Sequence, residues 1–359
     1  MVGQIISAAG YLAIFIAPAL LALSAVISEP LLALGVALLL FPLARIVFGV
    51  HRPGEPPVWD ERLALVLERL PLVYALALVG ALVTVLISWY SSAPSPGEAL
   101  QWTLSLWVTL VFATCVAHEL VHRSRGSDRL MGHVLAGLAG YPVLGYEHLR
   151  HHRLAGNTAA AEWPRCEESV WSFAARRIFR ITAETVGMRG LAWHGDPRSP
   201  TVRGLRLALA ATAVTWALFG AAAGWLGAAI FGLVVVLVAF AIQLVTYMQH
   251  WGLGDDCMAS ASKYEWGWED DCRFQSWVTL NLSLHQAHHD TPGRPYFRIG
   301  LAAASPRLPA GYVLLMFAAL IPPLWRRVME PARTYWMTHP AQPLSSGRRV
   351  TCAAVYRRA

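Results

Sequence analysis

Nine of the 13 histidines in this 359-residue chain stand in short groups whose spacing suits metal binding. The segment HELVH holds two, the segments EHLRHH and HQAHH hold three each, and the last one ends a long apolar run. In a helix, residues three or four apart lie on one face, so the rings of each group can converge on one site. The nine are His118, His122, His148, His151, His152, His250, His285, His288 and His289.

Neutral imidazole is a good ligand for first-row metals such as iron and zinc. One zinc ion takes about four ligands, so nine histidines are too many for one ion and suit two, with positions left for oxygen or water. The sequence therefore predicts a dinuclear metal site. The remaining histidines have no such neighbours and are expected to be structural: His51, His133, His194 and His339.

Three carboxylates stand beside these histidines in the sequence, namely Glu119, Glu147 and Asp290. A carboxylate next to a ligand can accept the second ring N–H and so orient the imidazole. Such residues also cap or solvate helix ends, and the sequence leaves both roles open. No catalytic residue beyond the metal ligands is predicted.

HELVH also matches the zinc protease pattern, in which two histidines bind the metal and Glu119 would be the base. An intramembrane protease would need a third ligand, typically an aspartate from another span, but the apolar runs after His122 contain no Asp or Glu. Seven histidines would also have no role. The soluble di-iron bundles use two ExxH motifs, and this region has only one, from Glu119 to His122. A histidine-rich site is therefore favoured over both alternatives.

The elements that must position these residues are apolar. The chain is 56% hydrophobic and 14% charged, whereas soluble domains carry about 25% charged residues. Six runs approach the roughly 20 residues that cross a bilayer. They are residues 5–27, 31–50, 71–89, 104–117, 205–224 and 228–248. The predicted fold is an all-α integral membrane protein, a bundle of six transmembrane helices with a cytosolic histidine-rich cap.

The positions of Lys and Arg predict the orientation, because cytoplasmic loops are enriched in these residues. Neither occurs in the connections around 28–30 and 91–101 or between the last two spans, so these connections are expected on the outer side. Both termini and the metal site are then expected in the cytosol, at a bacterial-type inner membrane. The predicted segments are four transmembrane helices (1–122), a cytosolic segment (123–204), two transmembrane helices (205–250), a cytosolic cap (251–344) and a flexible basic tail (345–359).

The net charge of +7 is interpreted as the excess of Lys and Arg in the cytosolic segments, where these residues can also contact anionic lipid. Docking of an acidic protein on the basic face is the alternative, and nucleic acid is not an expected partner. No two of the five cysteines form a CxxC motif. Their spacing therefore argues against a fused rubredoxin or iron–sulfur module. Those in predicted cytosolic segments are expected to be reduced thiols. With no flavin or nicotinamide motif either, electrons must come from outside.

Four motifs, HELVHR, EHLRHH, TYMQHWG and LSLHQAHH, resemble the histidine motifs of the membrane-bound alkane monooxygenases, relatives of xylene monooxygenase and the membrane fatty-acid desaturases. ESVWSF and LPAGYVLLMFAALIPPLWRRVMEP also resemble segments of that family, so the resemblance covers roughly residues 100–331. EHLRHH has one residue fewer between its histidines than the alkane hydroxylase motif, and Gln249 stands where a glutamate commonly precedes the histidine. Neither difference removes a ligand.

The resemblance implies two non-haem iron ions as cofactor, O2 as co-substrate, and electrons from a rubredoxin or ferredoxin with its reductase. It implies hydroxylation of an apolar small molecule dissolved in membrane lipid, an alkane or alkyl aromatic. The alternatives are a desaturase or a carotenoid or lipid oxidase that uses the same metal site, and then the intramembrane zinc metalloprotease.

Overall fold

The computed structural model of this chain describes residues 2–54, 56–257, 267–303 and 305–338. The predicted basic tail, residues 345–359, and His339 lie outside these ranges. Within them the regular structure is helical, apart from two isolated β-bridges. The chain divides into unit 1, made of Met1–Leu40, Asp60–Tyr146 and Ile181–Ala241, and unit 2, made of Phe41–Trp59, Glu147–Arg180 and Ile242–Ala359. Four helices, α3, α7, α8 and α10, continue from one unit into the other.

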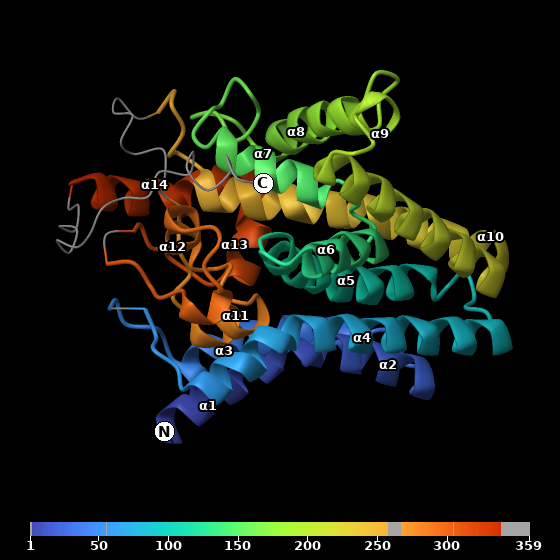
Figure 1. Ribbon diagram of the computed structural model, residues 1–359. Helices are drawn as coiled ribbons and strands as arrows, with labels where there is room; N and C mark the ends of the chain where they lie inside the picture. The colour runs from blue at the N-terminus through green and yellow to red at the C-terminus, as the bar shows by residue number, and fades with distance from the viewer. Residues whose placement is uncertain (1, 55, 258–266, 304, 339–359) are drawn as a thin grey trace. The chain divides into compact units, whose positions relative to one another are not determined.

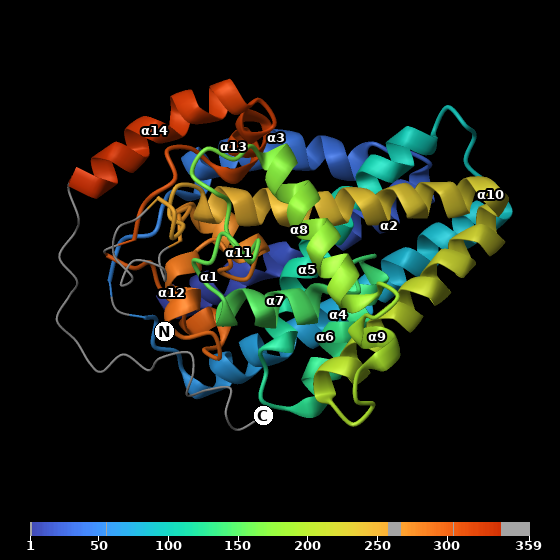
Figure 2. The ribbon, with the colours of Figure 1, turned by 90° about the horizontal axis from the view of Figure 1, so that it is seen from above.

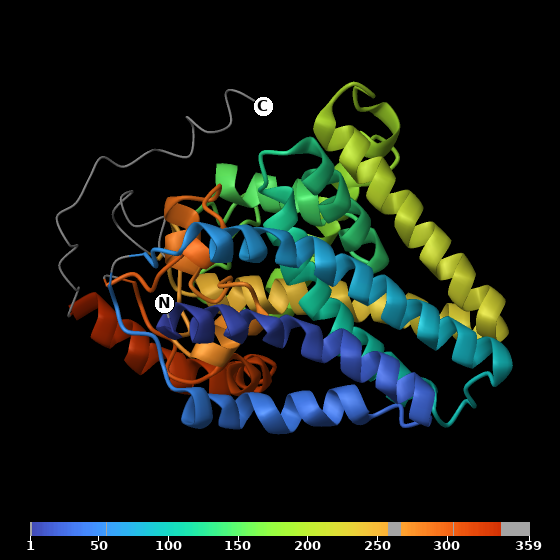
Figure 3. The same cartoon turned by 60° about the horizontal axis from the view of Figure 1, so that its bottom comes forward.

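Unit 1 consists mainly of long apolar helices. Its first part is α1 (Val2–Gly10), the 3-10 helix η1 (Tyr11–Phe15) and α2 (Ile16–Ile27), followed by α4 (Glu61–Ser91), α5 (Ala99–Val121) and α6 (Gly126–Leu138). Helix α4 packs along α2, and α5 along α6 (Figures 1 and 3).

The start of α4 shows how the sequence sets a helix boundary. The side chain of Asp60 accepts the backbone N–H of Arg62 at 3.0 Å, and Glu61 occupies the first turn. Both features stabilise a helix N-terminus.

Large apolar side chains are exposed on several helices of this unit. Leu39, Leu76 and Ile87 are 71%, 71% and 63% exposed. Large apolar side chains exposed along one helix after another are expected where lipid is the solvent.

Four helices are long and apolar enough to cross a membrane: Gly3–Ile27, Glu61–Ser91, Ala99–Val121 and Pro200–His250. Helix α3 (Leu32–Phe48) is a shorter apolar helix of 17 residues. The all-helical membrane architecture is therefore confirmed. The count of six crossings stays a prediction.

Helix α10 (Pro200–His250) spans 51 residues but is interrupted at Ala223 and Gly224, where the backbone leaves the helical region. Gly224 has φ +60°, a conformation that glycine adopts without strain. Figure 2 shows the chain reversing direction there. The rings of Phe219 and Phe231 stack with centroids 5.1 Å apart across the two arms. The break lies where the sequence separates the last two predicted spans.

Unit 2 is built from short helices and connecting segments. Its helices begin with most of α7 (Leu144–Arg153) and the first part of α8 (Val170–Thr185). They continue with α11 (Arg273–Val278), α12 (His285–Asp290), η3 (Tyr296–Arg298), α13 (Tyr312–Ala319) and α14 (Pro322–Thr338). Helix α13 packs against α14 (Figure 2). The four-residue α9 (Leu191–His194) belongs to unit 1.

His133 has a packing role within unit 1, consistent with its expected structural assignment. Its imidazole fills the space left by two glycines, Gly145 at the start of α7 and Gly204 at the start of α10, where an added Cβ would collide with the ring. Three helices can approach one another only because these two positions lack a side chain. The contact fixes the residues that lead into EHLRHH.

Candidate metal centre

Seven of the nine predicted ligands gather in unit 2. They come from three places, the helix α7, the last residue of α10 and the helix α12. Every one is at most 8% exposed. The seven are His148, His151, His152, His250, His285, His288 and His289.

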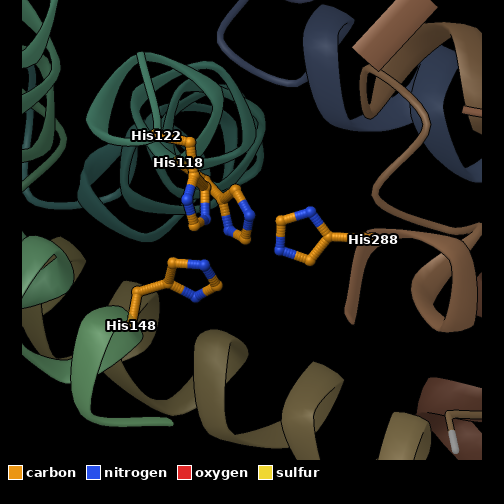
Figure 4. Close-up of side chains that lie close together, drawn as sticks. All are labelled: His118, His122, His148 and His288. Atoms are coloured by element: carbon orange, nitrogen blue, oxygen red, sulfur yellow. The ribbon is translucent and has the colours of Figure 1, made fainter. Parts of the chain in front are cut away.

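Three of these histidines, His148, His152 and His288, form a trio joined through their Nε2 atoms. The Nε2 of His152 lies 2.8 Å from that of His148 and 3.0 Å from that of His288. His148 and His152 are one helical turn apart on α7, whereas His288 comes from α12. Figure 4 shows the rings of His148 and His288 facing each other.

The other four, His151, His250, His285 and His289, form a quartet with ligand atoms all within 4.8 Å of one another. The Nε2 of His285 lies 2.9 Å from that of His250 and 2.9 Å from that of His289, and the Nε2 atoms of His151 and His289 are 3.3 Å apart. Trio and quartet together give two separate sets of converging nitrogens.

Hydrogen bonding between rings cannot account for this arrangement. A neutral imidazole carries one N–H, so a nitrogen such as the Nε2 of His285, which approaches two others, cannot satisfy both contacts. Burial and the neighbouring imidazoles lower the pKa of His151 and His285 well below 6.5, so these rings are neutral. Neutral imidazole is the form that binds first-row metals. Each set therefore suits one cation.

The remaining two predicted ligands, His118 and His122, lie in unit 1. His118 is in the last turn of α5 and His122 follows that helix directly, with ring centroids 5.1 Å apart. Figure 4 shows both rings leaving consecutive turns of this helix. An added Cβ at Gly132 would lie 2.9 Å from the Cβ of Leu120, so this glycine lets α6 pack closely against the helix end that carries the pair.

The three carboxylates predicted beside the ligands differ in their surroundings. Glu119 pairs with Arg123, which follows the end of α5, at 2.8 Å. Glu147 is buried and accepts hydrogen bonds from Arg177 at 2.7 Å and from Gln243 at 3.1 Å. Asp290 is exposed and accepts from Gln286 at 2.9 Å.

Three buried residues that the sequence did not single out also border the histidines. The ring of Trp163 stacks on His250 with centroids 4.3 Å apart and planes at 16°. Glu162 lies next to His151, and Glu269 accepts the backbone N–H of Ala287 in α12 at 3.4 Å. These contacts join residues far apart in the chain, so no spacing pattern could have found them.

Glu269 makes the stability of this region pH-dependent. Burial raises its pKa from 4.5 to about 7, although Ser305 and Arg307 both bind its carboxylate. Because the folded pKa lies above the unfolded one, the stabilising contribution is fully present below pH 4.5 and is lost as pH rises through about 7. The shift corresponds to about 3 kcal/mol.

Replacing Glu269 by Gln should therefore remove this pH-dependent term, since an amide resembles the protonated acid. Thermal unfolding in detergent, compared at pH 5 and pH 7.5, should show a larger loss of stability in the wild-type protein than in Glu269→Gln. Parallel losses would contradict the assignment. The other titrating groups are common to both proteins and cancel in the comparison.

The prediction that the cytosolic cysteines stay as reduced thiols is wrong for one pair, because the structure joins Cys166 to Cys257 by a disulfide. The surrounding hydrogen bonds explain how residues 91 positions apart meet. The backbone N–H of Cys166 binds Asp256 at 2.9 Å, and the hydroxyl of Thr158 binds Asp255 at 2.6 Å. These bonds hold the segment after EHLRHH against the segment after His250.

Comparison with known proteins shows which family and which individual proteins this chain is similar to. The family model described as fatty acid desaturase matches residues 96–319. Among similar proteins is alkane 1-monooxygenase 1 of Pseudomonas aeruginosa, with 30% identity over 252 residues, which cover 66% of this chain and 64% of that protein. The chain thus spans somewhat less than two thirds of that relative.

Two further relatives come from Pseudomonas putida. An alkane 1-monooxygenase is 26% identical over 318 residues, 82% of this chain and 76% of the relative. The hydroxylase component of a xylene/toluene monooxygenase is 24% identical over 251 residues, 66% of this chain and 65% of the relative. The resemblance predicted from the four histidine motifs is confirmed, and the matched region contains all nine histidines. The chain belongs to the fatty acid desaturase family.

Proposed function

We propose that this protein is a membrane-bound non-haem di-iron monooxygenase that hydroxylates a C–H bond of an apolar substrate, an alkane or an alkyl aromatic, with O2 and externally supplied electrons. The observation that carries the proposal is the pair of buried nitrogen sets, the trio and the quartet. The relatives named as alkane and xylene/toluene monooxygenases support the reaction class.

In this proposal the quartet holds one iron, and the trio, completed by His118 and His122, holds the other. Nine imidazoles then serve two ions, in agreement with the ligand count predicted from the sequence. When bound, iron would supply the redox chemistry by which oxygen attacks a C–H bond. Glu119, Glu147 and Asp290 are proposed to orient nearby rings through their second nitrogens.

The protein would contribute neutral ligands, exclusion of water and a path for the substrate. Burial lowers the pKa of His151 and His285 and so keeps these two rings uncharged. The apolar helices of unit 1 face lipid, from which an apolar substrate can reach the helix ends. We propose six crossings of a bacterial-type inner membrane, with the termini and metal site in the cytosol, and a rubredoxin or ferredoxin with its reductase as electron source. The basic cytosolic face would steer an acidic carrier.

Two measurements test the function. Metal analysis of protein purified without oxygen should find two irons per chain, and cells supplied with 18O2 should give an alcohol that carries the label. Label from water in place of oxygen gas would reject monooxygenation. A product with a new double bond and no inserted oxygen would identify a desaturase, the alternative that uses the same metal site.

A further inference from the structure

The segment that follows EHLRHH contains a buried carboxylate, Glu162, that is 0% exposed. Two guanidinium groups bind it. Arg150 pairs with its Oε1, and Nη1 of Arg177 lies 2.8 Å from its Oε2. The same Oε2 lies 3.5 Å from Nδ1 of His151, a member of the quartet. The carboxylate therefore stands between buried positive charges and a predicted ligand.

Arg177 fixes the position of this carboxylate. It is 2% exposed, and its Nη1 also binds the carbonyl oxygens of Ala161 and Glu162 at 3.0 and 2.5 Å. Its Nε donates to Glu147 at 2.7 Å, and Glu147 accepts from Gln243 of α10 at 3.1 Å. A guanidinium is planar and always charged, so these bonds lock the helices and the loop into one geometry.

The two nitrogens of His151 face different partners. Its Nδ1 faces Glu162, and its Nε2 faces the Nε2 of His289 at 3.3 Å. A carboxylate beside one ring nitrogen of a neutral imidazole places the N–H there and leaves the lone pair on the other nitrogen. The separation of 3.5 Å is that of an ion-pair contact and not of a formed hydrogen bond, so the carboxylate acts on the ring through its charge. Glu162 thereby favours the tautomer that can bind an ion within the quartet.

The next residue in the chain supports a second member of the quartet. Trp163 is 0% exposed, and its ring stacks on that of His250 at 4.3 Å. The dipeptide Glu162–Trp163 therefore borders His151 and His250 together. Arg177 holds it through the carbonyl and the carboxylate of Glu162 and through the carbonyl of the preceding residue, Ala161.

We propose that Glu162, held in place by Arg177, is a positioning residue for the quartet: it fixes the Nδ1–H tautomer of His151 and directs the Nε2 of that ring to the ion. The inference rests on the proposed function for the identity of the metal. It goes beyond that function because the sequence considered only Glu119, Glu147 and Asp290 for this role, beside helix capping, and did not identify Glu162.

A purely structural ion pair is the competing explanation, and the chain offers a matched control for it. Glu168 binds the neighbouring arginine, Arg176, at 2.6 and 2.9 Å, and its side chain is only 5% exposed. Its contacts among the described residues involve no histidine. Glu162→Gln and Glu168→Gln therefore each remove one charge from a partly or fully buried carboxylate–arginine pair, but only the first touches a predicted ligand.

The test uses the full-length protein loaded with Fe(II), with the ferrous chelator ferrozine as acceptor. Glu162→Gln should release one of two irons about 10-fold to 100-fold faster than wild type, the range typical when a partner of a ligating histidine is lost. Glu168→Gln should stay within about twofold of wild type, and Glu162→Asp, which keeps the charge, should recover part of the retention.

A double-mutant cycle separates positioning from general destabilisation. The cycle is read as the affinity for Fe(II) titrated into iron-free protein. In a His151→Ala background, which weakens the quartet by one ligand, Glu162→Gln should cause no further weakening, because the ring it acts on is absent. Additive effects of the two changes, or equal iron loss in Glu162→Gln and Glu168→Gln, would overturn the proposal. If wild-type protein binds zinc in place of iron, the proposed function fails, while the same cycle with Zn(II) still tests Glu162.

Discussion

Replacing His250 by alanine should remove one of the two irons and lower hydroxylation by more than about 100-fold, beyond the upper range for loss of a partner that only supports a ligand. His250 is fully buried, and its Nε2 lies 2.9 Å from the Nε2 of His285 within the quartet. The stacked ring of Trp163 covers it on one face. Iron per chain and product formation are the two measurements.

His194→Ala is the matched control for this change. His194 ends the short helix α9, is exposed, and its Nε2 contacts the backbone oxygen of Met188 at 3.0 Å. It should keep two irons and wild-type activity. If His250→Ala also keeps both, the quartet is not a metal site, and loss of activity in the control would point to a general effect of histidine removal.

The sequence was most informative where chemistry and periodicity coincide. Histidines three or four apart on short helices identified the residues that make up the trio and the quartet, because a helix brings such residues to one face. The division of each motif between the two sets was not predicted. The break at Gly224 could also be predicted, since two apolar runs of membrane length need a connection between them. These features depend on neighbours along the chain, which a single sequence displays.

Contacts between segments that are distant in the chain could not be predicted from the sequence in the same way. Glu162 and Trp163 follow EHLRHH by ten residues or more, and nothing in their spacing indicates that they border His151 and His250. The disulfide between Cys166 and Cys257 spans 91 residues and was missed for the same reason. The rule that cysteines in the cytosol stay reduced was wrong for this pair, because it describes cysteines on average. Whether two particular cysteines meet depends on the local hydrogen bonds around them.

The assignment of His118 and His122 to the trio leads to the second large effect. If these two residues share one iron with the trio, His122→Ala and His288→Ala should each remove that same iron and reduce hydroxylation by more than about 100-fold. The double variant should retain one iron, because the quartet is intact. Combining His122→Ala with His250→Ala should instead leave no iron, since one ligand is then missing from each set. Iron counts for the four variants, with His194→Ala as reference, distinguish this arrangement from one in which seven histidines suffice, where His122→Ala alone would keep both ions.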